Sequence, residues 1–217
     1  MVAERVTIAG DGPPLAGDLL RPEAGPAMAG VVVCHPHPAY GGTRQSHVVQ
    51  AIAGAVVAQR MAALVFDFRG AGESAGDSEA GPAEWTDAAR ALDHLGQSLG
   101  PGRPLAICGY SFGAWVALNV GAMDPRVRAV AAVAPGLSNP DDMGGRPVLV
   151  VHPEHDHITP VEDVADWLGQ AGGGEFAVVH GADHYLQAEA PQVARQVAAF
   201  LARALAGGSP PSVIARG

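Results

Sequence analysis

The sequence predicts an α/β fold, a doubly wound and mostly parallel sheet of about eight strands with helices on both faces. Short, apolar, β-branched segments alternate along the chain with longer Ala-rich segments. Residues 31–33 and 148–151 are continuously apolar, which is typical of strands buried on both faces of a parallel sheet. From the third strand onward the order is strand, helix, strand, which implies right-handed crossovers within one sheet.

The elements follow from this alternation. The first two strand segments have no helix between them, so we expect them to form a hairpin. Helical segments separate the later strands, and Pro191 falls in a first helical turn, where proline is tolerated. The predicted strands are Val6–Ile8, Leu15–Leu20, Gly30–Cys34, Ala63–Phe68, Pro104–Cys108, Ala129–Ala134, Pro147–His152 and Glu175–His180. The predicted helices are Ser46–Gln59, Glu84–Leu99, Phe112–Met123, Val161–Gln170 and Pro191–Leu205.

The chain length of 217 residues and the hydrophobic content of 48% suit one domain with a substantial core. We expect this domain to span residues 1–206 and to be followed by a flexible Gly- and Pro-rich tail, 207–217. The segment 135–146, between the sixth and seventh strands, is too short for a helical cap with its own core. The sequence therefore predicts no cap domain.

The composition excludes several functions. A net charge of −9 makes nucleic acid an unsuitable partner, because binding it needs a basic face. All 13 basic residues are Arg, which excludes Schiff-base chemistry, a pyridoxal phosphate anchor, a Ser–Lys dyad and a phosphate-loop lysine. The apolar runs are too short to cross a bilayer, and the N-terminus lacks an apolar signal core. We expect a cytoplasmic protein that does not bind membranes, and its oligomeric state, monomer or homodimer, stays open.

One serine has the setting of a catalytic nucleophile. Residues 109–113, Gly-Tyr-Ser-Phe-Gly, match the nucleophile-elbow pattern G-x-S-x-G, and residues 72–76 match it again. Ser111 follows a buried strand and opens an apolar helix, whereas Ser74 continues into a polar loop. A helix N-terminus beneath the hydroxyl favours developing negative charge. We therefore predict that Ser111 is the nucleophile; the alternative is an incidental serine in a Gly-rich turn.

A serine nucleophile needs a base and an orienting acid, which follow it in the order acid, then histidine, in folds with this elbow. His184 lies on the loop after the last strand and is the predicted base, while His180, at the strand end, is predicted to be structural. Asp156 lies in the turn after the seventh strand and is the predicted acid. A turn-forming or capping role is the alternative for Asp156. Asp141 and Asp142, which follow the sixth strand, are the alternative acids.

An oxyanion hole needs two backbone N–H groups. Phe112, directly after the nucleophile, is expected to supply one of them. His37 is expected to supply the other, because Pro36 and Pro38 beside it have no N–H. The residues expected to wall an open, substrate-binding cleft are Tyr40, Tyr110, Leu137, Ile158 and Tyr185.

The many histidines of the chain suggest a metal site as an alternative. His152, His155, Asp156 and His157 lie in one turn, but no helical H-E-x-x-H pair or zinc-type Cys pair is present. We therefore expect no metal and no cofactor. Cys34 and Cys108 are predicted to be buried, apolar and unpaired.

Four motifs together resemble a known superfamily. They are residues 35–38 (His-Pro-His-Pro) with Gly41 and Gly42, residues 67–74 (Asp-Phe-Arg-Gly-Ala-Gly-Glu-Ser), the elbow at Ser111, and residues 181–184 (Gly-Ala-Asp-His). The chain resembles the α/β-hydrolase superfamily, and more narrowly the compact, cap-less bacterial hydrolases related to carboxylesterases and dienelactone hydrolases.

The resemblance implies a Ser-His-Asp carboxylesterase that cleaves small esters through an acyl-enzyme, without a cofactor. It also implies a structural role for Arg69. A serine replaces the nucleophilic cysteine of dienelactone hydrolase, which favours a general esterase over a lactone-specific enzyme. Thioesters, lactones and peptides remain alternative substrates. A non-catalytic ligand-binding protein of the same fold remains an alternative function.

Overall fold

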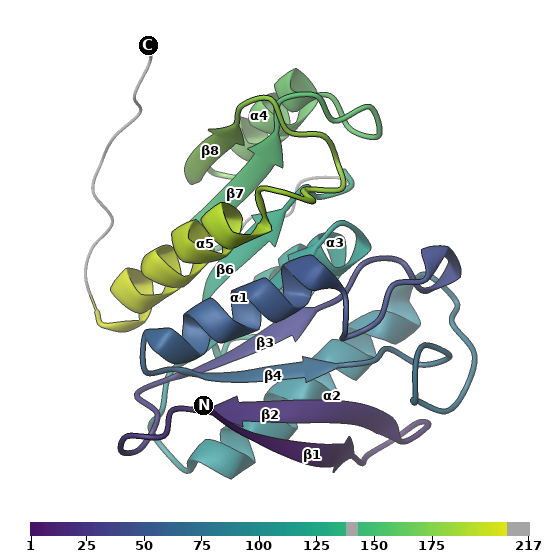
Figure 1. The fold of residues 1–217 in the computed structure, drawn as a ribbon, viewed down its shortest axis with the longest axis vertical. Coiled ribbons are helices and arrows are strands. Elements are labelled where there is room, and N and C mark those ends of the chain that lie inside the picture. The colour runs from purple at the N-terminus through teal and green to yellow at the C-terminus, as the bar shows by residue number, and fades with distance from the viewer. Residues whose placement is uncertain (138–142, 208–217) are drawn as a thin grey trace.

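The computed structural model describes residues 1–137 and 143–207. Within these residues eight strands form one sheet in the order β1-β2-β4-β3-β5-β6-β7-β8 (Figure 1), which confirms the predicted fold class. The strands are β1 Val2–Ile8, β2 Leu15–Arg21, β3 Gly30–Cys34, β4 Ala62–Phe66, β5 Leu105–Tyr110, β6 Val127–Val133, β7 Val148–Pro153 and β8 Glu175–Val179. The helices are α1 His47–Ala58, α2 Pro82–Leu99, α3 Phe112–Met123, α4 Val161–Gln170 and α5 Ala190–Leu205, with a short 3₁₀ helix η1 at Pro38–Tyr40.

The first two strands form the expected antiparallel hairpin. β2 also pairs antiparallel with β4, and the pairs from β4 through β3, β5, β6 and β7 to β8 are parallel. The chain leaves β3 for β4 on one side and leaves β5 for β6 on the other. A switch point therefore lies between the carboxyl ends of β3 and β5, where sheets of this kind form their sites.

The helices cover both faces of the sheet, as expected. α1 and α5 pack on one face over Val31, Val33 and Cys108, while α2, α3 and α4 pack on the other over Val32 and Ile107 (Figure 1). Neighbouring residues of one strand face opposite layers because strand side chains alternate. Since both layers are apolar, the central strands are apolar throughout their length, which is the pattern that the sequence displays.

Several element ends lie one to four residues from their predicted positions; β1, for example, begins at Val2 rather than Val6. Two of these differences have a clear local cause. β4 ends at Phe66 rather than Phe68 because the N–H of Phe68 leaves the ladder and donates to the imidazole of His35. α2 begins at Pro82 rather than Glu84 because proline is accommodated in the first turn. The Glu84 carboxylate accepts from the N–H of Gly81 at 2.8 Å and so closes the helix start.

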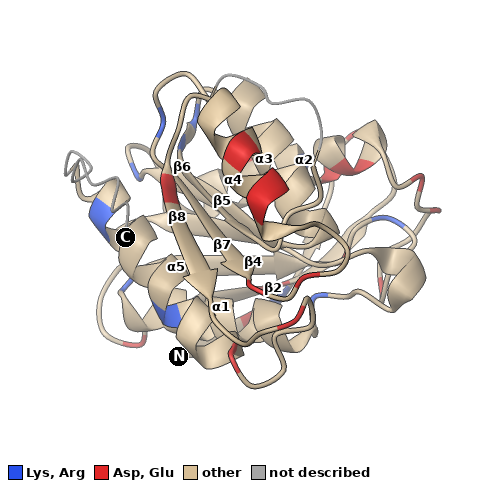
Figure 2. Cartoon of the chain, turned by 90° about the horizontal axis from the view of Figure 1, so that it is seen from above, with Lys and Arg blue, Asp and Glu red and all other residues tan. Residues whose placement is uncertain are grey.

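The acidic excess of the sequence is visible along the chain. Figure 2 shows acidic residues on several elements; α4, for example, carries Glu162 and Asp163 in its first turn. Among the helices of the described residues, none combines the length and apolarity that a bilayer-spanning helix needs. The predicted tail falls mainly on 208–217, outside the described residues, as do the alternative acids Asp141 and Asp142.

Candidate active site

Ser111 occupies a sharp turn between β5 and α3. Its φ is 56° and its ψ is −119°, a conformation that non-glycine residues rarely adopt. The turn is held by a 2.9 Å hydrogen bond from the Ser111 N–H to the carbonyl of Val133. Glycine is required on both sides, because a Cβ at Gly109 would overlap the Gly113 carbonyl, and one at Gly113 would overlap the Cys34 carbonyl. The two glycines therefore let α3 begin directly against the ends of β5 and β3.

The serine hydroxyl belongs to a hydrogen-bonded row of three side chains. The Nε2 of His184 lies 2.9 Å from the Oγ of Ser111, although 73 positions separate the two residues in sequence. The Nδ1 of His184 lies 2.6 Å from a carboxylate oxygen of Asp156. An ionised carboxylate can only accept, so Nδ1 carries the proton and Nε2 is free to accept from the serine hydroxyl. The row therefore has the polarity needed to remove a proton from Ser111.

Asp156 is buried and held by its own turn. Its second carboxylate oxygen accepts from the backbone N–H groups of Ile158 at 2.8 Å and Thr159 at 3.1 Å. Burial acts to raise the pKa of Asp156, but the hydrogen bonds from His184 and from these two N–H groups outweigh it and lower the pKa below its usual value. The carboxylate is therefore ionised at neutral pH and can stabilise a positive charge on His184.

Two backbone N–H groups are available beside the serine. Among the hydrogen bonds within the described residues, neither the N–H of His37 nor that of Phe112 has a partner. The rings of these residues lie 4.9 Å apart between centroids, so the loop after β3 lies against the start of α3. Unpaired donors at a helix N-terminus are suited to a developing oxyanion.

The family is decided by comparison with known proteins. The model of the serine aminopeptidase family S33 matches residues 25–147, more than half of the chain. The chain belongs to this family. The S33 protein is also similar to solved structures. An α/β serine hydrolase homologue from Coxiella burnetii is 27% identical, with a TM-score of 0.84 over 91% of this chain and 97% of that one.

Two further relatives extend the comparison. A lid-less α/β serine hydrolase from Xanthomonas campestris is 25% identical, with a TM-score of 0.81 over 96% of this chain and 97% of that one. A protein from Rickettsia prowazekii is 26% identical over 183 residues, which cover 78% of this chain and 77% of the relative. The chain is therefore a hydrolase of the α/β-hydrolase superfamily, and its residues 1–137 and 143–207 include no cap domain.

A buried histidine, His35, supports the loop that carries His37 in this hydrolase. Its Nδ1 donates to the carbonyl of Pro36 at 2.6 Å, and its Nε2 accepts from the N–H of Phe68 at 2.9 Å. Burial lowers the pKa of His35 to about 4, so the ring is neutral and keeps this donor–acceptor pattern. This supporting role of His35 was not predicted from the sequence. Its signal was a histidine at the end of a strand that is otherwise wholly apolar.

Buried ion pairs fix the neighbouring loops. The guanidinium of Arg44 pairs with the buried carboxylate of Asp67, which also accepts from the backbone N–H of Arg44 at 2.7 Å and of Glu73 at 3.0 Å. In a second ion pair, the guanidinium Nη2 of Arg69 lies 2.7 Å from the carboxylate Oδ1 of Asp87. This pair is in line with the structural role that the resemblance implied for Arg69. Each partner here would be costly to remove alone, because the other charge would remain buried without a partner.

Four of the five predicted wall residues have exposed side chains, and three of the four, all but Leu137, lie within three positions of His37, Asp156 or His184 in sequence. Tyr40 is 89% exposed, Ile158 63%, Tyr185 57% and Leu137 39%. Ring contacts connect two of them to site residues: Tyr40 packs against His37, with centroids 5.2 Å apart, and Tyr185 against His184, with centroids 6.1 Å apart.

Tyr110 differs from that prediction. It is 5% exposed, and its hydroxyl donates to the backbone carbonyl of His184 at 2.7 Å. Alternation along β5 places Tyr110 on the same face as Cys108, beneath α1 and α5 rather than above the carboxyl edge of the sheet. The burial of Tyr110 corrects its expected place on the cleft wall.

Among the remaining histidines, His152 lies beside this row, with its Nε2 3.7 Å from a carboxylate oxygen of Asp156, whereas His180 and the cysteines lie outside it. The ring of His180 is largely exposed, 3.4 Å from Glu154, and His152 is buried with its Nε2 2.9 Å from the Thr159 carbonyl. No cluster of three His, Cys, Asp or Glu side chains able to hold a metal occurs in the described part of the chain. Cys34 and Cys108 are free and buried.

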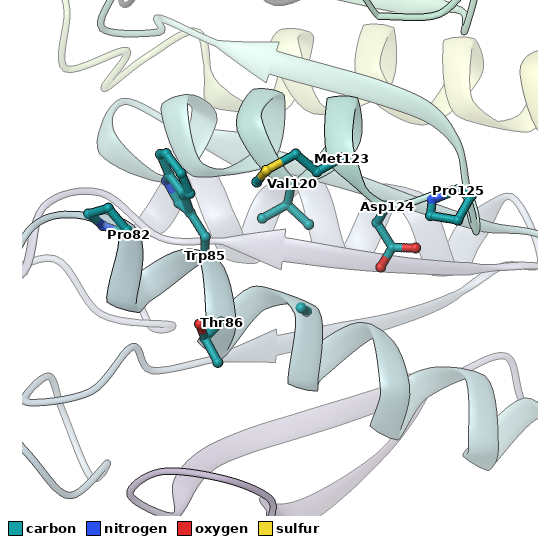
Figure 3. A pocket seen from close by; sticks show the side chains of 8 residues that line it. Pro82, Trp85, Thr86, Val120, Met123, Asp124 and Pro125 are labelled. Atoms are coloured by element: carbon teal, nitrogen blue, oxygen red, sulfur yellow. The ribbon is translucent and has the colours of Figure 1, made fainter.

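A groove of about 450 Å³ lies between α2 and α3 (Figure 3). Trp85, Val120 and Met123 line it together with Pro82 and Pro125. None of the three hydrogen-bonded side chains at Ser111 contributes to it, so this groove is separate from the candidate active site.

Proposed function

We propose that this hydrolase cleaves small carboxylic esters through an acyl-enzyme, with Ser111 as nucleophile, His184 as base and Asp156 as orienting carboxylate. One observation carries the proposal: the hydrogen-bonded row from the Ser111 Oγ through the His184 imidazole to Asp156. A serine hydroxyl is a weak nucleophile on its own, and a base within 3 Å that is held by an ionised carboxylate is what activates it.

The acylation step follows from the polarity of this row. The Nε2 of His184 takes the hydroxyl proton as the Ser111 Oγ attacks the ester carbonyl carbon, and the C=O electrons move to oxygen. Asp156 stabilises the imidazolium that forms. The N–H groups of Phe112 and His37 donate to the oxyanion, and one such donor contributes roughly 10²- to 10³-fold to rate. When the intermediate collapses, the imidazolium returns its proton to the leaving alcohol.

Deacylation repeats these steps with water. The imidazole removes a proton from a water molecule, which attacks the acyl carbon, and the imidazolium then protonates the Ser111 Oγ as the carboxylic acid leaves. No step of this sequence calls for a metal or an organic cofactor. The exposed apolar side chains of Tyr40, Ile158 and Tyr185 suit a neutral acyl or alkyl group.

Peptide hydrolysis is a second candidate, favoured by the description of the matching family as serine aminopeptidases. The same three residues would perform it, since an amide differs from an ester in its leaving group. A panel of aryl esters, aryl thioesters, lactones and aminoacyl anilides separates the candidates by kcat/KM. Esters are expected to rank first, and a higher value for the anilides would replace the esterase proposal with the aminopeptidase one.

Covalent labelling tests whether the protein is a serine hydrolase at all. A fluorophosphonate should modify the wild-type protein at Ser111, as located by peptide mass spectrometry. The Ser111→Ala variant should not be labelled, whereas Ser74→Ala should be labelled like the wild type. An unlabelled wild-type protein that also fails to hydrolyse the panel would favour a ligand-binding protein without catalysis.

A further inference from the structure

The loop that carries His184 needs an anchor to the nucleophile. It follows β8 and has no regular secondary structure before α5 begins at Ala190. Within the loop, the N–H of Tyr185 donates to the Asp183 side chain at 2.9 Å, and the N–H of Leu186 to the Asp183 carbonyl at 3.2 Å. Two other bonds join the loop to the turn after β7: the N–H of Gly181 donates to the Glu154 carboxylate at 2.8 Å, and the N–H of His155 to the Ala182 carbonyl at 2.9 Å. None of these four bonds reaches β5, which leads into the serine.

Tyr110 supplies a direct connection. Its hydroxyl donates to the backbone carbonyl of His184 at 2.7 Å, and its ring centroid lies 5.8 Å from that of the His184 imidazole. Tyr110 is the last residue of β5 and directly precedes Ser111. The bond therefore joins the peptide segment of the nucleophile to the peptide segment of the base, across 74 positions of sequence.

We infer that Tyr110 is a positioning residue, whose hydroxyl fixes the imidazole of His184 at the distance and angle that proton transfer from Ser111 requires. This inference rests on the proposed function. Tyr110 contacts the backbone of His184 rather than the reacting atoms, so it acts through His184. A misplacement of about 1 Å in such a pair costs roughly 100-fold in rate, so one buried bond has a large effect on catalysis.

The surroundings of Tyr110 suit this role. Burial, followed by the nearby charges of Asp156 and Asp183, raises the pKa of the Tyr110 hydroxyl above its usual value. The hydroxyl therefore keeps its proton and remains a donor over the working range of the enzyme. The loop keeps its bonds to the turn after β7 and an exposed one to α1, where the Nε2 of His47 lies 3.0 Å from the Tyr185 carbonyl. Loss of the buried bond should therefore loosen the loop without detaching it.

The Tyr110→Phe substitution removes the hydroxyl and keeps the ring packed in the core. Asn119→Ala is the matched control, because the Asn119 side chain also donates to a backbone carbonyl at 2.7 Å and is almost buried. Asn119 lies on α3 and touches no residue of the proposed machinery through its side-chain hydrogen bond. Both substitutions remove one bond of the same kind and length, so thermal unfolding followed by circular dichroism should show similar losses of stability.

The two variants should differ in catalytic rate. We expect Tyr110→Phe to lower kcat for an aryl acetate by roughly 10- to 100-fold, with KM within about twofold of the wild type. The rate of fluorophosphonate labelling should fall by the same factor. Asn119→Ala should keep both rates within about twofold. The downfield proton signal of the His184–Asp156 hydrogen bond should shift or broaden in Tyr110→Phe alone.

Three outcomes would overturn the inference. A wild-type kcat with an unchanged downfield proton in Tyr110→Phe would show that the bond does not position His184. A raised KM with unchanged kcat would show that Tyr110 contributes to substrate binding rather than to the position of His184. Equal losses of rate in the two variants would reduce its role to stability. Failure of the proposed function itself has a different signature, since the wild-type protein would then not be labelled at Ser111.

Discussion

The hydroxyl of Ser74 donates to the backbone carbonyl of Asp67 at 2.6 Å and accepts from the N–H of Ala16 at 2.9 Å. These bonds tie the loop after β4 to strand β2, which lies between β1 and β4. Ser111 matches the same five-residue pattern, yet its hydroxyl faces an imidazole. One serine therefore serves as a structural link between loops, and the other is available for chemistry.

The two serines should respond differently to alanine. Ser111→Ala should abolish ester hydrolysis and leave the fold intact, because it removes the attacking oxygen. Ser74→Ala should keep kcat within about threefold but lower the free energy of unfolding by about 1–2 kcal/mol, because it leaves the Ala16 N–H unpaired. Ester assays and urea denaturation of both variants measure these effects. The reverse pattern, with activity lost at Ser74 and kept at Ser111, would reject the nucleophile assignment.

Substitutions of the two histidines near the end of β8, His184 and His180, should also have different effects on activity. His184→Ala should lower kcat by roughly 10⁴- to 10⁶-fold, and Asp156→Asn by about 10⁴-fold, because the imidazole is lost or held in the wrong tautomer. His180→Ala serves as the control, since its ring is largely exposed beside Glu154. Steady-state kinetics of the three variants provide the measurement. An active His184→Ala enzyme paired with an inactive His180→Ala enzyme would identify the other histidine as the base.

His35 should make the fold sensitive to acid. Burial lowers the pKa of His35 from 6.5 to about 4, so between these values the unfolded chain binds a proton that the folded chain does not. The stabilising effect of the neutral ring is complete above pH 6.5 and is lost as the pH falls towards 4. The loss is ~1.4 kcal/mol per pH unit, or about 3 kcal/mol in total.

Urea unfolding at a series of pH values tests this expectation. Carboxylates with lowered pKa, such as Asp156, lose stability in the same direction, so the wild-type curve alone does not isolate the histidine. The difference between wild type and His35→Gln does, because the carboxylates are common to both. The wild-type curve should be steeper between pH 6.5 and 4, and parallel curves would show that His35 titrates normally in the folded state.

The open cleft should favour short acyl chains. Each fully buried methylene contributes ~0.8 kcal/mol, which is about fourfold in kcat/KM. In the proposed site, exposed side chains such as Tyr40, Ile158 and Tyr185 form the wall, and we expect an uncapped wall of this kind to bury only the first few methylenes. The gain should therefore level off by roughly four to six acyl carbons. Aryl esters from acetate to palmitate give the measurement, and a value that still rises at about ten carbons would indicate a deep tunnel.

Strand and helix identity could be predicted from the sequence by itself. The apolar, β-branched runs can be buried only in a sheet covered on both faces, and the helices between them follow from Ala-rich periodic segments. The choice of Ser111 over Ser74 needed only the strand before it and the apolar helix after it. The choice of His184 and Asp156 depended on chain order, since parallel strands bring their carboxyl ends to one edge of the sheet.

The positions and hydrogen-bond partners of individual residues at that edge were decided only by the tertiary structure. Tyr110 was expected in the cleft, but its place in the alternation of β5 sends it into the core, where the His184 carbonyl from a distant loop accepts its hydroxyl. Phe68 was expected in a strand, but the imidazole of His35 takes its N–H. Both outcomes depend on partners far away in sequence. Local propensity and periodicity report on neighbours along the chain, whereas the partner of a polar group at a strand end is set by which loops the topology places beside it.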